Sequence, residues 1–372
     1  MGDPLKILAI EPYYGLSHEM FLSGYQRYSR HAVEIWDQPA RKWKWRMRGS
    51  AFHFAERARS CPPQDVPDII FASDFLNLAD WRALCPQRFR DVPCVLYFHE
   101  NQVNYPRGES APADHHYGWI NLSSALAADR VLFNSAYQRE LFLEVVASTL
   151  QRMPDYVPPG LTSRLRDKSS VFPVGIDFEP HEKIRDSYRL WSNPEPVILW
   201  NHRWEYDKDP DRFVDALVEL RDRGSRFRVV ICGESFGRMH PAFARASREL
   251  GSRIEHRGFL PDAKAYLHRA AKCDVVVSTA RHEFFGVSVV EAVSLGCLPV
   301  LPNALSYPEI VPPRLHPHFL YEDTPPLGEF LAAFLATPPL EYAEEIQSAV
   351  ERYHWRHLAP VLDNDMEALA SC

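Results

Sequence analysis

The amino-acid sequence predicts an α/β protein made of two doubly wound parallel sheets. Three observations lead to this prediction. Short apolar, β-rich runs alternate with helical patterns along the whole chain, as expected for buried parallel strands joined by crossover helices. Six such runs precede a polar, charged stretch at 178–193, and six follow it. The length of 372 residues is sufficient for two domains.

The expected strands follow one another at regular intervals. In the first half they are 5–10, 32–36, 68–72, 94–98, 130–133 and 171–174, and in the second half 196–200, 227–232, 254–258, 274–278, 299–301 and 319–321. The predicted domains are therefore residues 1–178 and 179–354. A final helix over 355–372 could return to the first domain.

Composition excludes several classes of protein. The chain has 42 basic and 49 acidic residues, a net charge of −7, and 46% hydrophobic residues, so it is neither disordered nor a wholly basic nucleic-acid coat. The seven cysteines are scattered without a C-x-x-C pair, which argues against a zinc ribbon. No apolar run approaches the ~18 residues of a membrane span. We expect a cytoplasmic protein with no stable membrane association.

Common nucleotide-binding fingerprints are missing from the sequence. Ligands of open α/β sheets bind at the carboxyl ends of the strands. The first strand is followed by EPYYGLSH, at 11–18, which has one glycine and no G-x-G-x-x-G. A P-loop is also absent, so a dinucleotide oxidoreductase and a P-loop NTPase are disfavoured.

The densest chemical cluster lies at 275–296. A strand ends at Ser278, a loop carries HEFFG, and a helix begins near Val287, whose free N–H groups form an anion site. Glu283 and Glu291 are eight residues apart, roughly 12 Å along a helix axis. They could reach from a sugar to the ribose of a nucleotide sugar. Alternatively, Glu283 only favours the helix dipole and Glu291 is a solvated helix residue.

A second cluster follows the strand at 196–200. Asp209 is expected to cap a helix whose first residue is Pro210, which leaves Arg203 and Lys208 in the preceding loop. Two cations at this place could clamp a diphosphate leaving group. Asp207 and Asp209 form a D-x-D that could bind a divalent metal, but helix capping explains Asp209 without one.

A basic and aromatic strip lies at 41–48. It contains five cations, two tryptophans and no acid, namely Arg41, Lys42, Trp43, Lys44, Trp45, Arg46 and Arg48 around Met47. Cations attract phosphates and indole rings stack on unpaired bases, which favours a single-stranded RNA loop. An amphipathic patch on a membrane surface and a solvated loop with one buried tryptophan are the alternatives.

Several of these motifs resemble a known family. The spacing Arg203…Lys208, followed by Glu283-x7-Glu291, resembles the retaining glycosyltransferases of the two-domain GT-B type. More specifically, seven segments resemble the tRNA-queuosine α-mannosyltransferase family: YGLSH at 14–18, KWKWR at 42–46, YFHENQ at 97–102, FNS at 133–135, HRWEYDKDP at 202–210, HEFFG at 282–286 and YPEI at 307–310. The resemblance covers nearly the whole chain. Leu16 departs from it, since a second glycine is expected there, and the long polar insertion of animal members is missing after 178–193.

The resemblance implies a fold and an activity. The fold would be GT-B, with two Rossmann-like domains facing a central cleft, the first binding the acceptor and the second the nucleotide sugar. The activity would be retaining transfer of mannose from GDP-mannose to queuosine in the anticodon of tRNA, without a metal or other cofactor. A lipid or small-sugar acceptor, or a non-catalytic tRNA- or nucleotide-sugar-binding protein, are the alternatives.

The resemblance also implies roles for individual residues. Arg203 and Lys208 would neutralise the leaving diphosphate, while Glu283 and His99 would contact the transferred sugar, His99 from across the cleft. The donor-binding residues would be Gly15, Phe285, Gly286 and Val287 near phosphates and hydroxyls, Glu291 at the ribose, and Gly258 and Phe259 near the base. The acceptor would meet the strip at 41–48 together with His18, Asn101 and Gln102.

Overall fold

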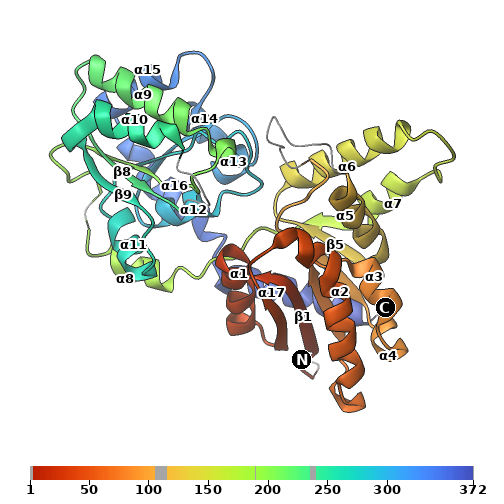
Figure 1. Ribbon diagram of the computed structural model, residues 1–372. Helices are drawn as coiled ribbons and strands as arrows, with labels where there is room; N and C mark the ends of the chain where they lie inside the picture. Colours follow the sequence, from red (N-terminus) through yellow and green to blue (C-terminus); the bar gives the residue numbers. More distant parts are fainter. Residues whose placement is uncertain (1–2, 105–114, 189, 235–239, 372) are drawn as a thin grey trace. The chain divides into compact units, whose positions relative to one another are not determined.

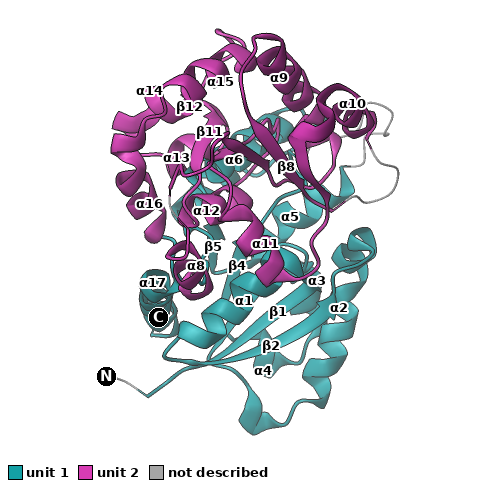
Figure 2. Ribbon diagram, turned by 90° about the vertical axis from the view of Figure 1, so that its left-hand side faces the viewer, with its two compact units in different colours: residues 1–177, 353–372 teal, residues 178–352 magenta. Residues whose placement is uncertain are grey.

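The computed structural model describes residues 3–104, 115–188, 190–234 and 240–371. It divides into two compact units (Figure 2). Unit 1 comprises residues 1–177 and 353–372, and unit 2 comprises residues 178–352. These limits differ by one or two residues from the predicted limits, and the final helix belongs to unit 1.

Unit 1 contains a parallel sheet of six strands in the order β2-β1-β3-β4-β5-β6. Figure 1 labels β1 and β5 of this sheet. The strands are β1 (Lys6–Tyr14), β2 (Ala32–Pro39), β3 (Ile69–Ser73), β4 (Cys94–Phe98), β5 (Arg130–Phe133) and β6 (Ser169–Val171). The helices are α1 (Leu16–Tyr28), α2 (Trp43–Ser60), α3 (Leu78–Leu84), α4 (Gln87–Arg90), α5 (His116–Ala127), α6 (Ala136–Gln151), α7 (Leu161–Asp167) and α17 (Trp355–Ala370).

Unit 2 repeats this architecture, with the strand order β12-β11-β10-β7-β8-β9. The strands are β7 (Val197–Trp200), β8 (Arg228–Cys232), β9 (Ile254–Gly258), β10 (Val275–Val277), β11 (Leu298–Pro302) and β12 (Leu320–Tyr321). The helices are α8 (Glu179–Arg185), α9 (Pro210–Asp222), α10 (Pro241–Leu250), α11 (Ala263–Ala270), α12 (Val287–Ser294), α13 (Tyr307–Ile310), α14 (His316–Phe319), α15 (Leu327–Ala336) and α16 (Ala343–Glu351).

The prediction of two doubly wound sheets is confirmed, because each predicted strand region contains a parallel strand. Three predicted limits are wrong by three residues or more; the first of them is that of β2, which ends at Pro39 and not at residue 36. The edge strand β6 comprises Ser169–Val171 and not residues 171–174. It pairs with β5, which has only four residues, and Pro173 has no N–H group with which to extend the pairing. The strand β1 continues to Tyr14 with a register shift after Glu11, so Glu11 belongs to the strand and not to the following loop.

Apolar strands explain why the two sheets form. Both faces of a doubly wound sheet are covered by helices, so residues such as Val275, Val276 and Val277 are fully buried in succession. The stretch at 178–193, predicted as a polar connection, instead contains α8, whose Ile184 and His181 are buried in unit 2. Among the described residues, no helix combines the length and the apolar character needed to cross a bilayer.

The helix α17 is fastened to unit 1 by one large ring and one carboxylate. Trp355 is fully buried and lies against Gly24 of α1 and Gly175. Asp363 accepts hydrogen bonds from the hydroxyl groups of Tyr25 (2.8 Å) and Ser29 (2.6 Å). The last helix therefore completes the core of the first unit.

The strand orders locate the edge of each sheet at which ligands of open α/β sheets bind. In unit 1 the chain reverses direction of winding between β1 and β3, and in unit 2 between β7 and β10. A crevice opens at the carboxyl ends of such strand pairs, because the following loops diverge to opposite faces of the sheet. The segments after these strands are consequently where a ligand site is expected.

Candidate active site

In unit 2, the loops after β7 and β10 are tied together at the reversal point. The hydroxyl of Thr279 donates to the carbonyl oxygen of Lys208 at 2.8 Å, and the N–H of Arg281 donates to the carbonyl of Asp207, also at 2.8 Å. The guanidinium of Arg281 also pairs with Asp209 at 2.7 Å. These bonds hold the two predicted chemical clusters beside one another.

Lys208 is buried at the centre of this junction. Its Nζ lies 2.6 Å from the carbonyl oxygen of His282, 3.1 Å from Oδ2 of Asp207 and 3.3 Å from Oε2 of Glu283. Burial alone would lower the pKa of Lys208, but the two carboxylates outweigh it and raise the pKa. The ammonium thus donates to His282 and Glu283 and forms an ion pair with Asp207, and the role predicted for Lys208 toward a diphosphate stays a prediction.

The carboxylate of Glu283 is held on both sides. Its Oε2 faces Lys208, while Oε1 accepts from the N–H groups of Phe284 (3.2 Å) and Phe285 (3.5 Å). Burial alone would raise the pKa of Glu283, but the charge of Lys208 outweighs it and lowers the pKa to about 2. Glu283 is therefore ionised and fixed in orientation, as a group that accepts hydrogen bonds from sugar hydroxyls must be.

The helix α12 begins at Val287, as predicted. Gly286 precedes it with a φ of 98°, a left-handed value that favours glycine, and a Cβ there would lie 3.2 Å from the ring of Tyr307. Of the three N–H groups predicted to bind the donor, that of Phe285 already donates to Glu283. Those of Gly286 and Val287 lie at the start of the helix, where intrahelical acceptors are lacking.

Glu291 is partly buried on α12, one to two turns further along. Burial raises its pKa to about 7, although a hydrogen bond with Tyr266 opposes this shift. The hydroxyl of Tyr266 in turn accepts from Asn201 at 2.9 Å, and Asn201 also donates to the carbonyl of Ser288 at 2.6 Å. Glu291 consequently belongs to a polar network between the loop after β7 and α12, and is not a solvated helix residue.

Arg203 differs from Lys208 in its exposure. Its guanidinium is partly exposed and lies 3.7 Å from Glu205. The predicted capping role of Asp209 is confirmed, because its side chain accepts from the N–H of Arg212, at the start of α9. With Asp209 bound to Arg281 and Asp207 bound to Lys208, both carboxylates of the D-x-D have cationic partners.

Gly258 and Phe259 lie apart from this cluster. Gly258 is the last residue of β9 and Phe259 follows it; β9 is the edge strand of the sheet and is separated from β7 by β8. Gly258 has a φ of 139°, and the ring of Phe259 is exposed. Their predicted place near a nucleotide base stays a prediction.

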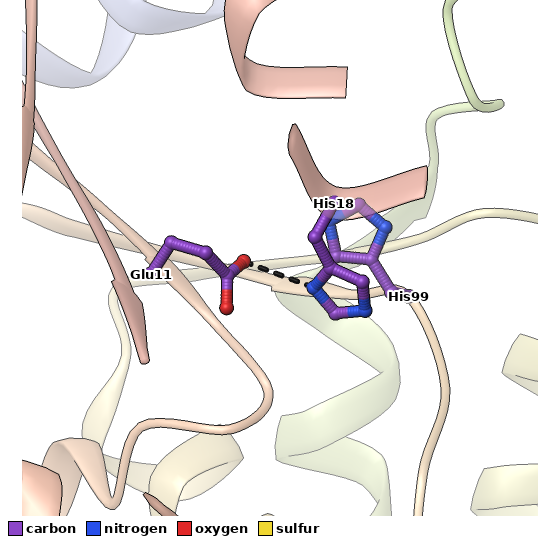
Figure 3. A group of neighbouring side chains, drawn as sticks. All are labelled: Glu11, His18 and His99. Atoms are coloured by element: carbon purple, nitrogen blue, oxygen red, sulfur yellow. Dashed lines mark hydrogen bonds and ion pairs between the residues drawn. The ribbon is translucent and has the colours of Figure 1, made fainter. Parts of the chain in front are cut away.

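In unit 1, three side chains meet at the carboxyl ends of β1 and β4 (Figure 3). Oε2 of Glu11 lies 3.0 Å from Nδ1 of His18, and the rings of His18 and His99 have centroids 3.9 Å apart. The other carboxylate oxygen of Glu11 accepts from the hydroxyl of Ser73 at 2.9 Å and from the N–H of Tyr13 at 2.8 Å. The predicted residues His18 and His99 thus lie ring against ring, and a buried carboxylate binds His18.

The pKa values of the two histidines in this cluster are shifted in opposite directions. Burial alone would lower the pKa of His18, but the carboxylate of Glu11 outweighs it and raises the pKa. Burial and the neighbouring charge of His18 lower the pKa of His99. Glu11, His18 and His99 also offer ligand atoms within 4.8 Å of one another, a donor set that could hold a divalent metal.

The loop after β4 is fixed by buried side chains from three other elements. The N–H of His99 donates to Asp74 at 3.0 Å, and the N–H of Gln102 donates to Asn121 at 2.7 Å. Asn134 donates to the carbonyl of His99 at 2.8 Å. Asn101 is fully buried, and its Oδ1 accepts from a backbone N–H of the same loop. Gln102 is less buried, and its side chain donates to Glu100.

The loop between β1 and α1 contains a strained residue. Leu16 has a φ of 51° and an exposed side chain. This is the position where the family resemblance leads us to expect a second glycine, and glycine adopts such a φ without steric cost. A Cβ at the preceding Gly15 would lie 2.8 Å from Ala40, so only glycine fits there without displacement.

The basic strip at 41–48 does not form one uniform surface. Trp43 begins α2 and packs against Tyr117, with centroids 5.0 Å apart, and Arg46 donates to the carbonyl of Pro39. Trp45 points outward and is 62% exposed. The exposed cations are Arg41, Lys42, Lys44 and Arg48.

Sequence reasoning missed several buried polar residues of both clusters: Glu11, Ser73, Asp74, Asn121, Asn134, Asn201, His202 and Tyr266. Glu11 had a detectable signal, since it is a charged residue directly after four apolar ones in a predicted strand region. Asp74 likewise follows the buried run IIFAS. Ser73 is the last residue of β3, and the others lie in helices or loops; none of them has a distinguishing local pattern.

Comparison with protein families gives two matches. A family model described as tRNA-queuosine alpha-mannosyltransferase N-terminal matches residues 6–176. One described as glycosyl transferases group 1 matches residues 182–322. Together they span most of both units.

Curated relatives share much of the length. The tRNA-queuosine alpha-mannosyltransferase of Drosophila melanogaster is 38% identical over 315 residues, which cover 82% of this chain and 81% of the fly protein. The GDP-mannose-dependent alpha-(1-6)-phosphatidylinositol dimannoside mannosyltransferase of Mycobacterium tuberculosis is 27% identical over 66% of this chain and 59% of that protein.

Solved structures show the same fold at lower identity. Alr3699/HepE of Anabaena, crystallised in complex with UDP, has a TM-score of 0.64 at 18% identity and covers 99% of this chain and 100% of that one. Sucrose-phosphate synthase from Thermosynechococcus elongatus has a TM-score of 0.70 at 14% identity, covering 98% and 99%. The fold is that of the GT-B glycosyltransferases, as the sequence predicted.

Proposed function

The chain belongs to the tRNA-queuosine α-mannosyltransferase family, and we propose that it transfers mannose from GDP-mannose to queuosine in the anticodon of tRNA, with retention of configuration. It is a glycosyltransferase by family and by fold. The proposed part is the identity of the donor, the acceptor and the stereochemical course.

The observation that carries the proposal is the buried ion pair between Lys208 and Glu283. It joins the two loops at the reversal point of the sheet in unit 2, where α/β sheets bind their ligands. The same two loops supply the exposed cation of Arg203 and the start of α12. A preformed carboxylate, a guanidinium on the adjacent loop and N–H groups at the start of a helix match a sugar joined to a diphosphate.

The chemistry proposed for this site needs stabilisation of a leaving group. The bond between the anomeric carbon of mannose and the diphosphate of GDP breaks, and a bond to a hydroxyl of the queuosine cyclopentenediol forms on the same face. The acceptor proton passes to the leaving phosphate oxygen, which gives GDP and mannosylated tRNA. Arg203 and the amide groups at Gly286 and Val287 would stabilise the charge of the departing diphosphate, an effect worth several kcal/mol in a closed site.

Fixed carboxylates would orient the donor. Glu283 would accept hydrogen bonds from hydroxyls of the mannose, and Glu291 from those of the ribose. Lys208 keeps Glu283 ionised and in place. We propose that no metal is needed, since both carboxylates of the D-x-D are paired with cations.

The names of the relatives support the donor and define a competing acceptor. The mycobacterial relative is named as GDP-mannose-dependent, and so is a Xanthomonas campestris relative, 26% identical, named for cellobiosyl-diphosphopolyprenol. Those two names describe lipid-linked acceptors, whereas the fly relative, at 38% identity, is named for queuosine in tRNA. We therefore propose the tRNA acceptor, and we propose the cytoplasm as its compartment because the six cysteines that the structure describes are free thiols.

Mass spectrometry of nucleosides tests the proposal. The protein is incubated with GDP-mannose and queuosine-containing tRNA, and the same tRNA with guanosine in place of queuosine serves as the control. One hexose added only to queuosine, and lost in the Arg203→Ala variant, supports the proposal. No added hexose with GDP-, UDP- or ADP-sugars, or transfer to polyprenyl diphosphate sugars instead of tRNA, would overturn it.

A further inference from the structure

The helix α2 exposes two aromatic side chains on one face. Trp45 is 62% exposed and Phe52 is 54% exposed. They are seven residues apart, which is about two helical turns, so both project from the same face at a separation of roughly 10 Å along the axis. Large apolar side chains in such a position contribute little to the core of unit 1.

Cations surround these rings. Arg48 lies between them in the i, i+3 and i+4 pattern of neighbours on a helix, and its guanidinium is 4.8 Å from the ring centroid of Tyr117. Lys44 is exposed next to Trp45. Among the residues that the structure describes, no acidic side chain forms an ion pair with Lys44, Lys42 or Arg41.

The part of α2 in which the aromatic face begins contains no acidic residue. The first turn of the helix contains none, and Glu56, the only acid of the helix, lies one turn beyond Phe52 and pairs with Arg59. Cations near the first turn are unfavourable for the helix because of its dipole. The sequence of α2 therefore places charge where helix stability does not require it.

The indole ring of Trp45 packs against its own helix at Gly49. A Cβ at Gly49 would lie 2.7 Å from the indole, which means that the ring rests against the helix surface at this glycine. One ring face is covered while the side chain as a whole stays mostly exposed. A supported ring with an open face is the arrangement on which an unpaired base stacks.

We propose that the outward face of α2 binds the single-stranded loop of the RNA acceptor, with unpaired bases stacked on Trp45 and Phe52 and phosphates beside Lys44 and Arg48. This proposal rests on the proposed function and extends it: it assigns the RNA contact to one helix face, adds Phe52, and removes Trp43 and Arg46, which bind within the protein. A charged face with two separated rings suits RNA better than a lipid surface, which requires a continuous apolar face.

Binding of the queuosine-containing anticodon stem–loop, measured by fluorescence anisotropy, tests the proposal without requiring catalysis. Trp45→Ala and Phe52→Ala should each raise the Kd roughly five- to hundredfold, the range for loss of one stacked base. Trp45→Phe should recover most of the affinity because it keeps a ring. Tyr156→Ala is the matched control, since Tyr156 is an exposed aromatic residue of unit 1 away from α2, and its Kd should not change.

Salt dependence separates the cations from the rings. Lys44→Ala and Arg48→Ala should each reduce the slope of log Kd against log salt by about 0.7, as for one lost contact with a single strand, whereas Trp45→Ala should leave the slope unchanged. In turnover, the aromatic variants should raise KM for tRNA with kcat retained.

Three outcomes decide the proposal. If Trp45→Ala and Phe52→Ala bind the stem–loop as tightly as the native protein while tRNA is still mannosylated, the proposed face is wrong and the proposed function stands. If both variants lose RNA binding although the native protein transfers no mannose, the face is supported and the function fails. If they instead lose binding to phosphatidylcholine–phosphatidylserine vesicles with RNA binding unchanged, α2 contacts membranes and the proposal is overturned.

Discussion

Nζ of Lys208 lies 3.3 Å from Oε2 of Glu283, in a buried position where both charges are compensated by the protein itself. The pair spans 75 residues of sequence and connects the segments that follow two adjacent strands of unit 2. Because the ammonium also donates to the carbonyl of His282, two hydrogen bonds set its position. The orientation of Glu283 consequently depends on Lys208.

Replacing Lys208 alone should lower the stability of the protein more than replacing both Lys208 and Glu283. Lys208→Met leaves Glu283 unpaired in a buried site, which should cost about 3–5 kcal/mol of stability. The double variant Lys208→Met/Glu283→Gln should recover part of that loss in urea denaturation. Equal stability of Lys208→Met and the double variant would contradict this expectation.

Activity should respond differently from stability. Glu283→Gln keeps the shape of the side chain but loses the ionised acceptor, so sugar transfer should fall about 10²–10³-fold, the range for loss of one preorganised electrostatic contact. Steady-state kinetics at saturating donor measures this. Transfer at the native rate by a folded Glu283→Gln variant would exclude the proposed role toward the sugar.

The protonation of Glu291 should make stability depend on pH. Burial raises its folded-state pKa to about 7 from an ordinary value of 4.5. Its contribution to stability is therefore fully present below pH 4.5 and is lost as the pH rises through 7. Glu291→Gln cannot ionise, so in urea denaturation between pH 5 and pH 8 it should gain stability relative to the native chain as the pH rises, at about 1.4 kcal/mol per pKa unit as an upper limit.

Nucleotide binding gives an independent readout at the same residue. If Glu291 accepts hydrogen bonds from ribose hydroxyls, its ionised form binds more tightly, and the affinity for GDP should increase between pH 6 and pH 8 in calorimetry. Glu291→Gln should remove this increase. An unchanged pH dependence in the variant would assign the effect to another group.

The contact between Trp355 and Gly24 should control the stability of unit 1. A Cβ at Gly24 would lie 2.1 Å from Nε1 of the indole, so Gly24→Ala should destabilise the protein by about 1–3 kcal/mol through overpacking. Trp355→Phe removes the part of the ring nearest to Gly24. The double variant Gly24→Ala/Trp355→Phe should thus lose less stability than the two single variants lose together, as measured by thermal unfolding. Additive losses would contradict the packing described.

Two exposed residues with left-handed backbone should behave alike in stability and differently in binding. Leu16 and Lys42 have φ values of 51° and 56°, which cost a non-glycine residue about 1–2 kcal/mol. Glycine relieves this strain, so Leu16→Gly and Lys42→Gly should each raise the melting temperature by a few degrees. Only Lys42→Gly should weaken RNA binding, because it also removes a cation of the strip at 41–48. Leu340→Gly, at an exposed position without positive φ, is the control and should lower stability.

The α/β architecture was predictable because it depends on local pattern. Twelve apolar runs separated by helical patterns indicate buried parallel strands wherever they occur, and each run contained a strand. The cap at Asp209 and the start of α12 at Val287 were predictable for the same reason, since capping is decided within a few residues. The family was also recognisable, from short motifs distributed along the whole chain.

The partners of the site residues were not predictable in this way. Nothing near Lys208 in the sequence indicates that its ammonium would be bonded to His282 and Glu283, or that Glu11 would bind His18 within the first unit. Trp43 and Trp45 have almost the same sequence context, yet one packs on Tyr117 and the other is exposed, because successive residues of a helix face in different directions.

By itself, the sequence determined the two sheets, the segments that follow their strands and the residue types available for chemistry there. The tertiary structure alone decided which of those side chains are buried, which charges neutralise one another and which remain exposed for a ligand. The physical reason is range: strand pattern and helix capping act over a few residues, whereas burial and ion pairing depend on segments brought together from 75 residues apart, as in Lys208 and Glu283.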